Sequence, residues 1–353
     1  MRKKILIALS IVTMLGLTGC QNEKETTVVS PTSTQVLNPT STSQPTETAS
    51  TSSITDENVF TFEQKEDGTI KITGLKDSTL EMVRIPEEIS GMVVTEIGDS
   101  AFKSCKNLTS VELPDSVTSI GDSAFESCKN LTSVELPDSL MKIGNFAFKN
   151  NNSLTSIEIP DSVTRIGIAA FKSSNLTNIK FPDGLTEIAG SAFESCYGLT
   201  SIEIPDSITK IGASAFEACK NLTSIKIPDS VTSIGNAAFK SCKSLTSIEL
   251  PDSVTIIGNS VFQSCISLTN IEILEGVTKI GESAFADCES LTSVELPDSL
   301  KSIGDYAFRN CVNLESVKMP EDVYRGSFAF QNTKLASFED DMWSYYGGEE
   351  GWE

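Results

Sequence analysis

Apolar residues recur along this chain with a period of about 23 positions, most visibly as a column of phenylalanines. Eight of the ten intervals between these phenylalanines are 23 residues long and two are 22. Most units repeat the same residues in the same order around the phenylalanine: leucine or isoleucine, Pro-Asp, Ile-Gly, Ala-Phe and cysteine. A unit this short cannot bury its own apolar side chains, so neighbouring units must stack. We expect a core built around Phe102, Phe125, Phe148, Phe171, Phe193, Phe216, Phe239, Phe262, Phe285, Phe308 and Phe330.

The pattern inside one unit, residues 108–130 (LTSVELPDSVTSIGDSAFESCKN), predicts two short strands. Val111 and Leu113 alternate with polar residues, as in a strand with one buried face. Pro114 ends that strand because proline cannot donate a hydrogen bond to a ladder. Val117 and Ile120 then predict a second short extended segment.

The rest of the unit predicts a turn that closes the coil. Gly121 permits a turn that a Cβ atom would strain. Residues 123–125 (Ser-Ala-Phe) predict a short helical turn with the phenylalanine inserted inward, and the small Ala124 lets coils approach closely. Each unit thus makes one coil, and equivalent residues stack about 4.8 Å apart.

The repeated pattern L-x-x-I-x-I-P-x-x-V-x-x-I-G-x-x-A-F-x-x-C resembles the BspA-type leucine-rich repeat over residues 93–330. The resemblance implies a mainly β repeat solenoid: a right-handed coil stack of 22–23-residue units with parallel strands and short helical turns. Residues 56–92 resemble the N-terminal cap of that family, a hairpin leading into the first coil. Proteins of the family are known from bacterial surfaces, several of them implicated in adhesion. The resemblance implies no enzyme and provides no catalytic residues.

Four departures interrupt the repeat. One residue is missing around 173–175, Leu274-Glu275 replaces Pro-Asp, and Ala189 replaces glycine. We expect the stack to tolerate these three. Arg325 stands where isoleucine is expected, which marks the approach to the C-terminal end.

The N-terminus predicts export and lipid attachment. Residues 2–4 are basic, residues 5–17 are apolar, and Leu-Thr-Gly-Cys follows at 17–20. The apolar run suits a signal peptide and is too short for a stable membrane-spanning helix. The ending resembles a bacterial lipobox, which predicts a signal peptide over 1–19 and a lipid on Cys20 as the only membrane attachment. The alternative is a cleaved signal with a chance cysteine.

A polar spacer should follow. Residues 21–55 contain 17 serines and threonines, with three prolines and no hydrophobic period. Such a segment cannot bury enough apolar surface to fold. We therefore expect a disordered tether over 20–55.

Charge and composition exclude several functions. The 353 residues carry 48 acids, 27 bases and no histidine, for a net charge of −21. Nucleic-acid phosphates need clustered basic residues, so no nucleic-acid partner is expected. The lack of histidine excludes the usual catalytic triads and histidine-containing zinc sites. We expect no enzyme, no cofactor and no metal site.

One outward strand position forms a mostly acidic column interrupted by three lysines. It is interpreted either as a soluble, non-sticky face or as a binding face for a basic partner. Specific calcium sites are not expected, because the repeat has no D-x-D-x-D-G loop. The candidate binding residues are Glu112, Glu135, Glu158, Glu203, Glu249, Glu272 and Glu295.

Eight further cysteines share one column of the repeat. Metal binding would need thiolates that converge on one point, and a column spreads them along a line. Parallel side chains also hold Cβ atoms about 4.8 Å apart, beyond the preferred disulfide spacing of about 3.8 Å. We therefore favour a ladder of buried thiols over disulfides at Cys105, Cys128, Cys196, Cys219, Cys242, Cys265, Cys288 and Cys311.

The last segment, 331–353, is acidic and contains Trp343 and Trp352. It is interpreted as a C-terminal cap or as an exposed aromatic binding segment.

Taken together, these patterns predict a lipid-anchored protein of the bacterial cell envelope. Its body, expected to be monomeric, binds an unidentified surface or host protein or glycan. One alternative is a structural envelope spacer without a ligand. The other is a carboxylate-dependent hydrolase, which would need one distinctive pair of carboxyls in a cleft.

Overall fold

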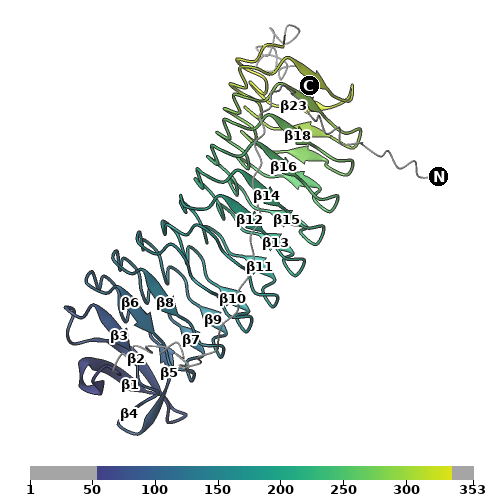
Figure 1. Cartoon of the computed structure of the whole chain (residues 1–353). Coiled ribbons are helices and arrows are strands. Elements are labelled where there is room, and N and C mark those ends of the chain that lie inside the picture. The colour runs from purple at the N-terminus through teal and green to yellow at the C-terminus, as the bar shows by residue number, and fades with distance from the viewer. Residues whose placement is uncertain (1–53, 336–353) are drawn as a thin grey trace, which may run out of the picture. The chain divides into compact units, whose positions relative to one another are not determined.

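The structure, a computed structural model, describes residues 54–335. They form a β-solenoid in which each 22–23-residue unit makes one coil, as predicted (Figure 1). The first strands of the coils are β3 (Met82–Arg84), β6 (Ser110–Glu112), β8 (Ser133–Glu135), β12 (Ser201–Glu203), β14 (Ser224–Lys226), β16 (Ser247–Glu249), β18 (Asn270–Glu272), β20 (Ser293–Glu295) and β22 (Ser316–Lys318).

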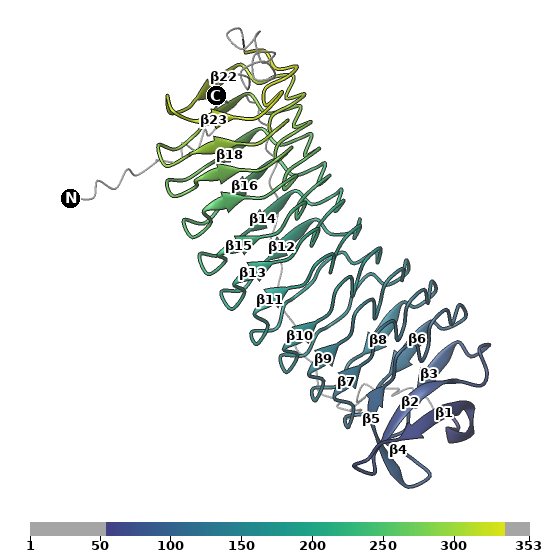
Figure 2. The ribbon, with the colours of Figure 1, turned by 180° about the vertical axis from the view of Figure 1, so that it is seen from behind.

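A second short strand follows in each coil, as predicted by residues such as Val117 and Ile120. These strands are β5 (Met92–Ile97), β7 (Ser119–Ile120), β9 (Lys142–Ile143), β10 (Arg165–Ile166), β11 (Glu187–Ile188), β13 (Lys210–Ile211), β15 (Ser233–Ile234), β17 (Ile256–Ile257), β19 (Lys279–Ile280), β21 (Ser302–Ile303) and β23 (Tyr324–Arg325). Most successive coils pair in parallel, and equivalent positions face one another (Figure 2). The second-strand ladder is interrupted between β10 and β11 and between β15 and β17. Because the register is residue for residue, each repeat position becomes a column along the stack.

The core of the solenoid is a stack of phenylalanine rings. All eleven predicted phenylalanines are buried. Neighbouring rings along this column lie nearly parallel, with centroids 5.0–5.8 Å apart. Leucine, isoleucine and valine from both strands fill the remaining interior, so the core is continuous from coil to coil.

The predicted short helical turn before each phenylalanine is wrong. Within residues 54–335 the only helix is the three-residue 3-10 turn η1 (Glu57–Val59), outside the repeats. Ser123 and Ser127 have positive φ angles of 56° and 64°. Their amides, and that of Phe125, donate to carbonyls of the next coil at 2.7–2.8 Å. Successive amides thus donate alternately to a carbonyl of their own turn and to a carbonyl of the neighbouring coil. In a helix every one of these amides would donate within the same segment.

Gly121 is needed for a different reason from the one expected. Its φ is not in the left-handed region, but a Cβ there would lie 2.6 Å from the Asp99 amide nitrogen and 2.7 Å from the Gly98 carbonyl carbon. Real Cβ atoms do not approach backbone this closely. The glycine therefore permits close contact between coils rather than an unusual turn.

An antiparallel hairpin precedes the coils. It pairs β1 (Phe60–Gln64) with β2 (Ile70–Leu75), and β2 continues in parallel to β5. A second hairpin joins β4 (Glu88–Ile89) to β5. Parallel stacking already begins at β3, which pairs with β6, inside the segment assigned to the cap from its sequence.

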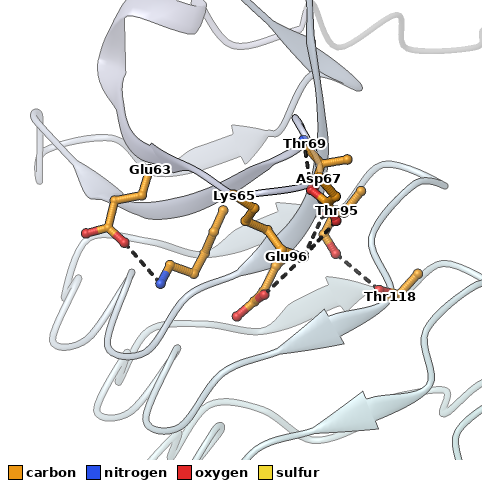
Figure 3. Close-up of polar contacts among 8 residues, drawn as sticks. Glu63, Lys65, Asp67, Thr69, Thr95, Glu96 and Thr118 are labelled. Carbon is orange, nitrogen blue, oxygen red and sulfur yellow. Dashed lines mark hydrogen bonds and ion pairs between the residues drawn. The ribbon is translucent and has the colours of Figure 1, made fainter.

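Polar contacts fasten the first hairpin to the coil that follows (Figure 3). Lys65 Nζ lies 3.6 Å from a carboxylate oxygen of Glu96 and 3.5 Å from the Thr95 hydroxyl, and that hydroxyl donates to Thr69 at 2.9 Å. The Thr69 hydroxyl and amide donate to Asp67, which lowers the pKa of that carboxyl. Since these charges are paired locally, the cluster serves attachment of the hairpin.

Candidate functional site

The acidic strand face is the outward side of the first strands, together with the residues that follow them. In β6, Val111 points inward, and Ser110 and Glu112 point outward. Six of the seven predicted glutamates are exposed, and Glu112 is half-buried with an oxygen 2.8 Å from Arg84 Nε. The structure therefore places the predicted residues on one surface, but in a line rather than around a centre.

Charge along this line is only partly compensated. Glu249 faces Glu272 in register, which places like charges on adjacent strands. Lys226 separates Glu249 from Glu203. Lys318 donates to Glu295, and this hydrogen bond raises the pKa of the lysine. Like charges directly opposite one another destabilise a sheet. The face thus retains uncompensated negative charge at a cost in stability.

A second acidic column beside the first was missed by the sequence reasoning. In the nine coils that span residues 115–298 it occupies the position after the proline, or after Leu274 in one coil, and all nine acids are exposed. Within the described residues only one of them forms an ion pair, Asp161 with Lys180 at 3.7 Å. The Pro-Asp signal was visible in every regular unit, and its fixed position in the repeat could have predicted this column. The column comprises Asp115, Asp138, Asp161, Asp183, Asp206, Asp229, Asp252, Glu275 and Asp298.

The first-strand ladder is interrupted between β8 and β12. Residues 156–159 and 178–181 belong to no strand, and in the described part of the chain they make no backbone hydrogen bond to a neighbouring coil. Glu158 is thus exposed but lies outside any ladder. On the phenylalanine side the same coils stay bonded, with the Phe171 amide 2.9 Å from the Ala192 carbonyl. The coil that lacks a residue at 173–175 therefore keeps its hydrogen bonds to the next coil at the phenylalanine turn, whereas its first-strand segments form no such bonds among the described residues.

Two hollows lie on this face at interruptions of the ladder. The strand-face hollow has a volume of about 530 Å³ and is lined by three successive coils. The first coil contributes Leu136 and Asp138, the second contributes residues 156–161, and the third contributes residues 178–180. A second hollow of about 550 Å³ lies at the junction of β18 and β20, where Leu274-Glu275 replaces Pro-Asp. At that junction each strand remains paired on its other side, with β16 and β22 respectively.

The cysteine column is a ladder of buried free thiols, as predicted. In seven coils the thiol donates to a phenylalanine carbonyl of the preceding coil at 2.9–3.2 Å. Burial raises the pKa of Cys128, Cys219, Cys265 and Cys311 to about 12. A thiol with so high a pKa is a poor nucleophile at neutral pH. The column is therefore structural.

Two residues replace cysteine in this column with different results. Ser174 keeps the hydrogen bond, since its hydroxyl donates to the Phe148 carbonyl at 2.8 Å. Asn151 is fully buried, and neither its amide nitrogen nor its oxygen has a partner. The coil next to the strand-face hollow thus carries an unsatisfied polar side chain.

Charged side chains on the turn edge pair between coils. Glu126 is held by Lys103 at 2.9 Å and Lys149 at 3.4 Å, which lowers the pKa of its carboxyl despite partial burial. Lys172 meets Glu194 at 2.7 Å. These lysines offset the charge of the glutamates on the turn edge. The carboxylates of the acidic strand face, by contrast, are mostly unpaired.

Within residues 54–335, no group of three metal-ligating side chains converges, and no helix has the length and apolarity to cross a bilayer. Cys20, residues 21–53 of the tether, Trp343 and Trp352 lie outside the described residues. The last tether residue, Thr55, is bonded to β3, since its amide donates to the Arg84 carbonyl at 3.1 Å.

Comparisons with known proteins agree with the repeat geometry. Residues 95–223 and 209–336 match the BspA type leucine rich repeat region, in six copies. No curated protein matches the chain. A leucine-rich repeat protein from Eubacterium ventriosum is 26% identical, with a TM-score of 0.52, over 80% of this chain and 95% of that one. A leucine rich cell surface protein from Faecalibacterium prausnitzii is 30% identical over 74% and 93% of the two chains, with a TM-score of 0.38.

A third solved structure, a leucine-rich repeat protein from Bacteroides ovatus, is 27% identical over 80% of this chain and 95% of that one, with a TM-score of 0.39. The family match spans most of the coils. The stacked coils, the phenylalanine column and the repeated Ile-Gly and Ala-Phe positions all follow one pattern, and on these grounds the chain belongs to the BspA-type leucine-rich repeat family.

Proposed function

We propose that this chain is a lipid-anchored bacterial surface protein whose acidic strand face binds a partner protein or glycan. The N-terminal signal and Cys20 support export and anchoring, and the described cell-surface relative supports the location. The tether over 20–55 would hold the solenoid away from the lipid. The repeats supply no catalytic constellation, so binding rather than catalysis is the role proposed for them.

The observation that carries the proposal is the pair of parallel acidic columns. They are exposed along the stack, and few of their carboxylates are paired. A surface of one charge sign steers an oppositely charged partner and speeds its association. The proposed partner therefore presents a basic surface.

The test is capture of partners from extracellular-matrix proteins and from bacterial surface material on the immobilised full chain. The variant Glu249→Gln/Glu272→Gln/Glu295→Gln removes three charges from the face. It should bind the captured partner more weakly, and its salt dependence should flatten.

A matched control removes three exposed glutamates outside the face, in Glu66→Gln/Glu282→Gln/Glu289→Gln. If both variants bind like the unaltered chain, the site does not lie at Glu249, Glu272 and Glu295. A spacer without a ligand predicts that no partner is captured and that the face variant is slightly more stable, because repulsion is relieved.

A further inference from the structure

The strand-face hollow differs from the rest of the acidic strand face in its backbone. β12, β14, β16 and β18 form a continuous ladder, whereas residues 156–159 and 178–181 have no inter-coil backbone bonds among the described residues. The facing edges of β8 and β12 are open as well. Four consecutive positions along the stack therefore have backbone donors and acceptors that no neighbouring coil uses.

Unpaired strand edges bind extended chains. A peptide can add to such an edge by main-chain hydrogen bonds, and its alternate side chains then face the same way. Native sheets usually block their edges to prevent this pairing. Here the open backbone lies at a hollow of about 530 Å³ rather than at an end of the stack.

The charges around the hollow select the side chains of such a peptide. Asp138, Glu158 and Asp161 line it and are exposed, and Lys180 is the only base among the lining residues. Lys180 already lies 3.7 Å from Asp161. A net negative rim remains, so lysine or arginine at alternate positions of a bound strand would be complementary.

We propose that the strand-face hollow binds an extended protein segment that carries lysine or arginine at alternate positions and pairs as a strand with the open backbone. The inference rests on the proposed function, because it locates partner binding within the acidic strand face. It adds the class of partner, a basic peptide segment in β conformation, and the coils that bind it.

The probe is a fluorescent octapeptide that alternates lysine and threonine, titrated into the full chain. The hollow variant, Asp138→Asn/Glu158→Gln/Asp161→Asn, is compared with the control Glu66→Gln/Glu282→Gln/Glu289→Gln. The control removes the same charge from exposed positions outside the acidic strand face. We expect the hollow variant to lose affinity roughly tenfold or more and the control to lose much less.

A second probe separates main-chain pairing from charge alone. The same octapeptide with N-methyl groups on alternate amides keeps its charge but loses hydrogen-bond donors. We expect it to bind roughly tenfold more weakly. Hydrogen exchange with the unmodified peptide should show new protection at 156–159 and 178–181.

Three results would overturn the inference. Equal losses in the two triple variants would show general attraction to the acidic chain without a role for the hollow, and would not decide the proposed function, which the capture experiment tests. Equal binding of the N-methylated peptide would exclude strand pairing. Failure of the unmodified octapeptide to bind at millimolar concentration would exclude the site. The proposed function fails separately, when the full chain captures no partner.

Discussion

Replacing Asn151 with cysteine should stabilise the solenoid. Asn151 occupies the cysteine column, is fully buried, and has no partner for either polar atom of its side chain. In seven other coils a thiol at this position donates to the phenylalanine carbonyl of the preceding coil. The variant Asn151→Cys should form the equivalent bond to the Phe125 carbonyl and remove the buried amide.

The size of the effect follows from the cost of leaving a buried polar group unpaired. That cost is about 1–3 kcal/mol, and the new thiol bond is weak, so we expect stabilisation of about 1–3 kcal/mol. Cysteine is a small apolar side chain that already fits this column in eight coils. The cavity left by the shorter side chain reduces the gain and does not reverse it.

Urea unfolding followed by circular dichroism measures the effect as an upward shift of the midpoint. Ser174→Cys is the matched control, because the Ser174 hydroxyl already donates at 2.8 Å to the Phe148 carbonyl. It should change stability by less than about 0.5–1 kcal/mol. Repeat proteins can unfold in parts, so hydrogen exchange in the coils around Asn151 should also slow in Asn151→Cys.

The reasoning is refuted if Asn151→Cys leaves the midpoint unchanged or lowers it while the control behaves as expected. In that case the Asn151 amide is satisfied in solution, and the coil beside the strand-face hollow carries no polar penalty.

Four other outcomes are expected. Phe216→Ala should cost about 3–5 kcal/mol, because the ring is stacked 5.7 Å from both neighbours; an unchanged melting temperature would mean that this ring contributes nothing to the core. The native chain should react with an aqueous reagent at almost none of the eight column thiols, and urea should reveal them; no thiol in the denatured, unreduced protein would indicate disulfides. Stability should fall between pH 9 and about 12, because the unfolded state loses thiol protons that the folded state retains; a flat profile of unfolding free energy over that range would contradict the raised pKa of Cys128, Cys219, Cys265 and Cys311. Cys20→Ser should release the protein from membranes or block its maturation; equal partition of both forms into the aqueous phase of a detergent extraction would exclude a lipid on Cys20.

Much of the fold could be predicted from residue order because the repeat is local. A period of 23 residues, alternation such as that around Val111, and the proline after it specify one coil, and a unit that cannot bury its own core must stack. The thiol ladder was predictable in the same way, since a fixed position in each unit becomes a column once the units stack.

The sequence misled where one residue pattern fits two backbones. Ser-Ala-Phe suits a helical turn by propensity. In the stack, however, amides of this turn donate hydrogen bonds to carbonyls of the next coil, and Ser123 adopts a positive φ that directs its amide there. Gly121 was read as a turn residue, whereas contact with the preceding coil, a tertiary effect, is what excludes a Cβ.

The amino-acid sequence by itself determined the coil, the inward phenylalanine column and the outward glutamates, because these depend on spacing within a unit. Only the tertiary structure decided what happens between units. It left the side chain of Asn151 buried without a hydrogen-bond partner. It also opened the first-strand ladder at 156–159 and 178–181, next to the coil that lacks a residue at 173–175, while hydrogen bonds between coils on the phenylalanine side hold the stack in register.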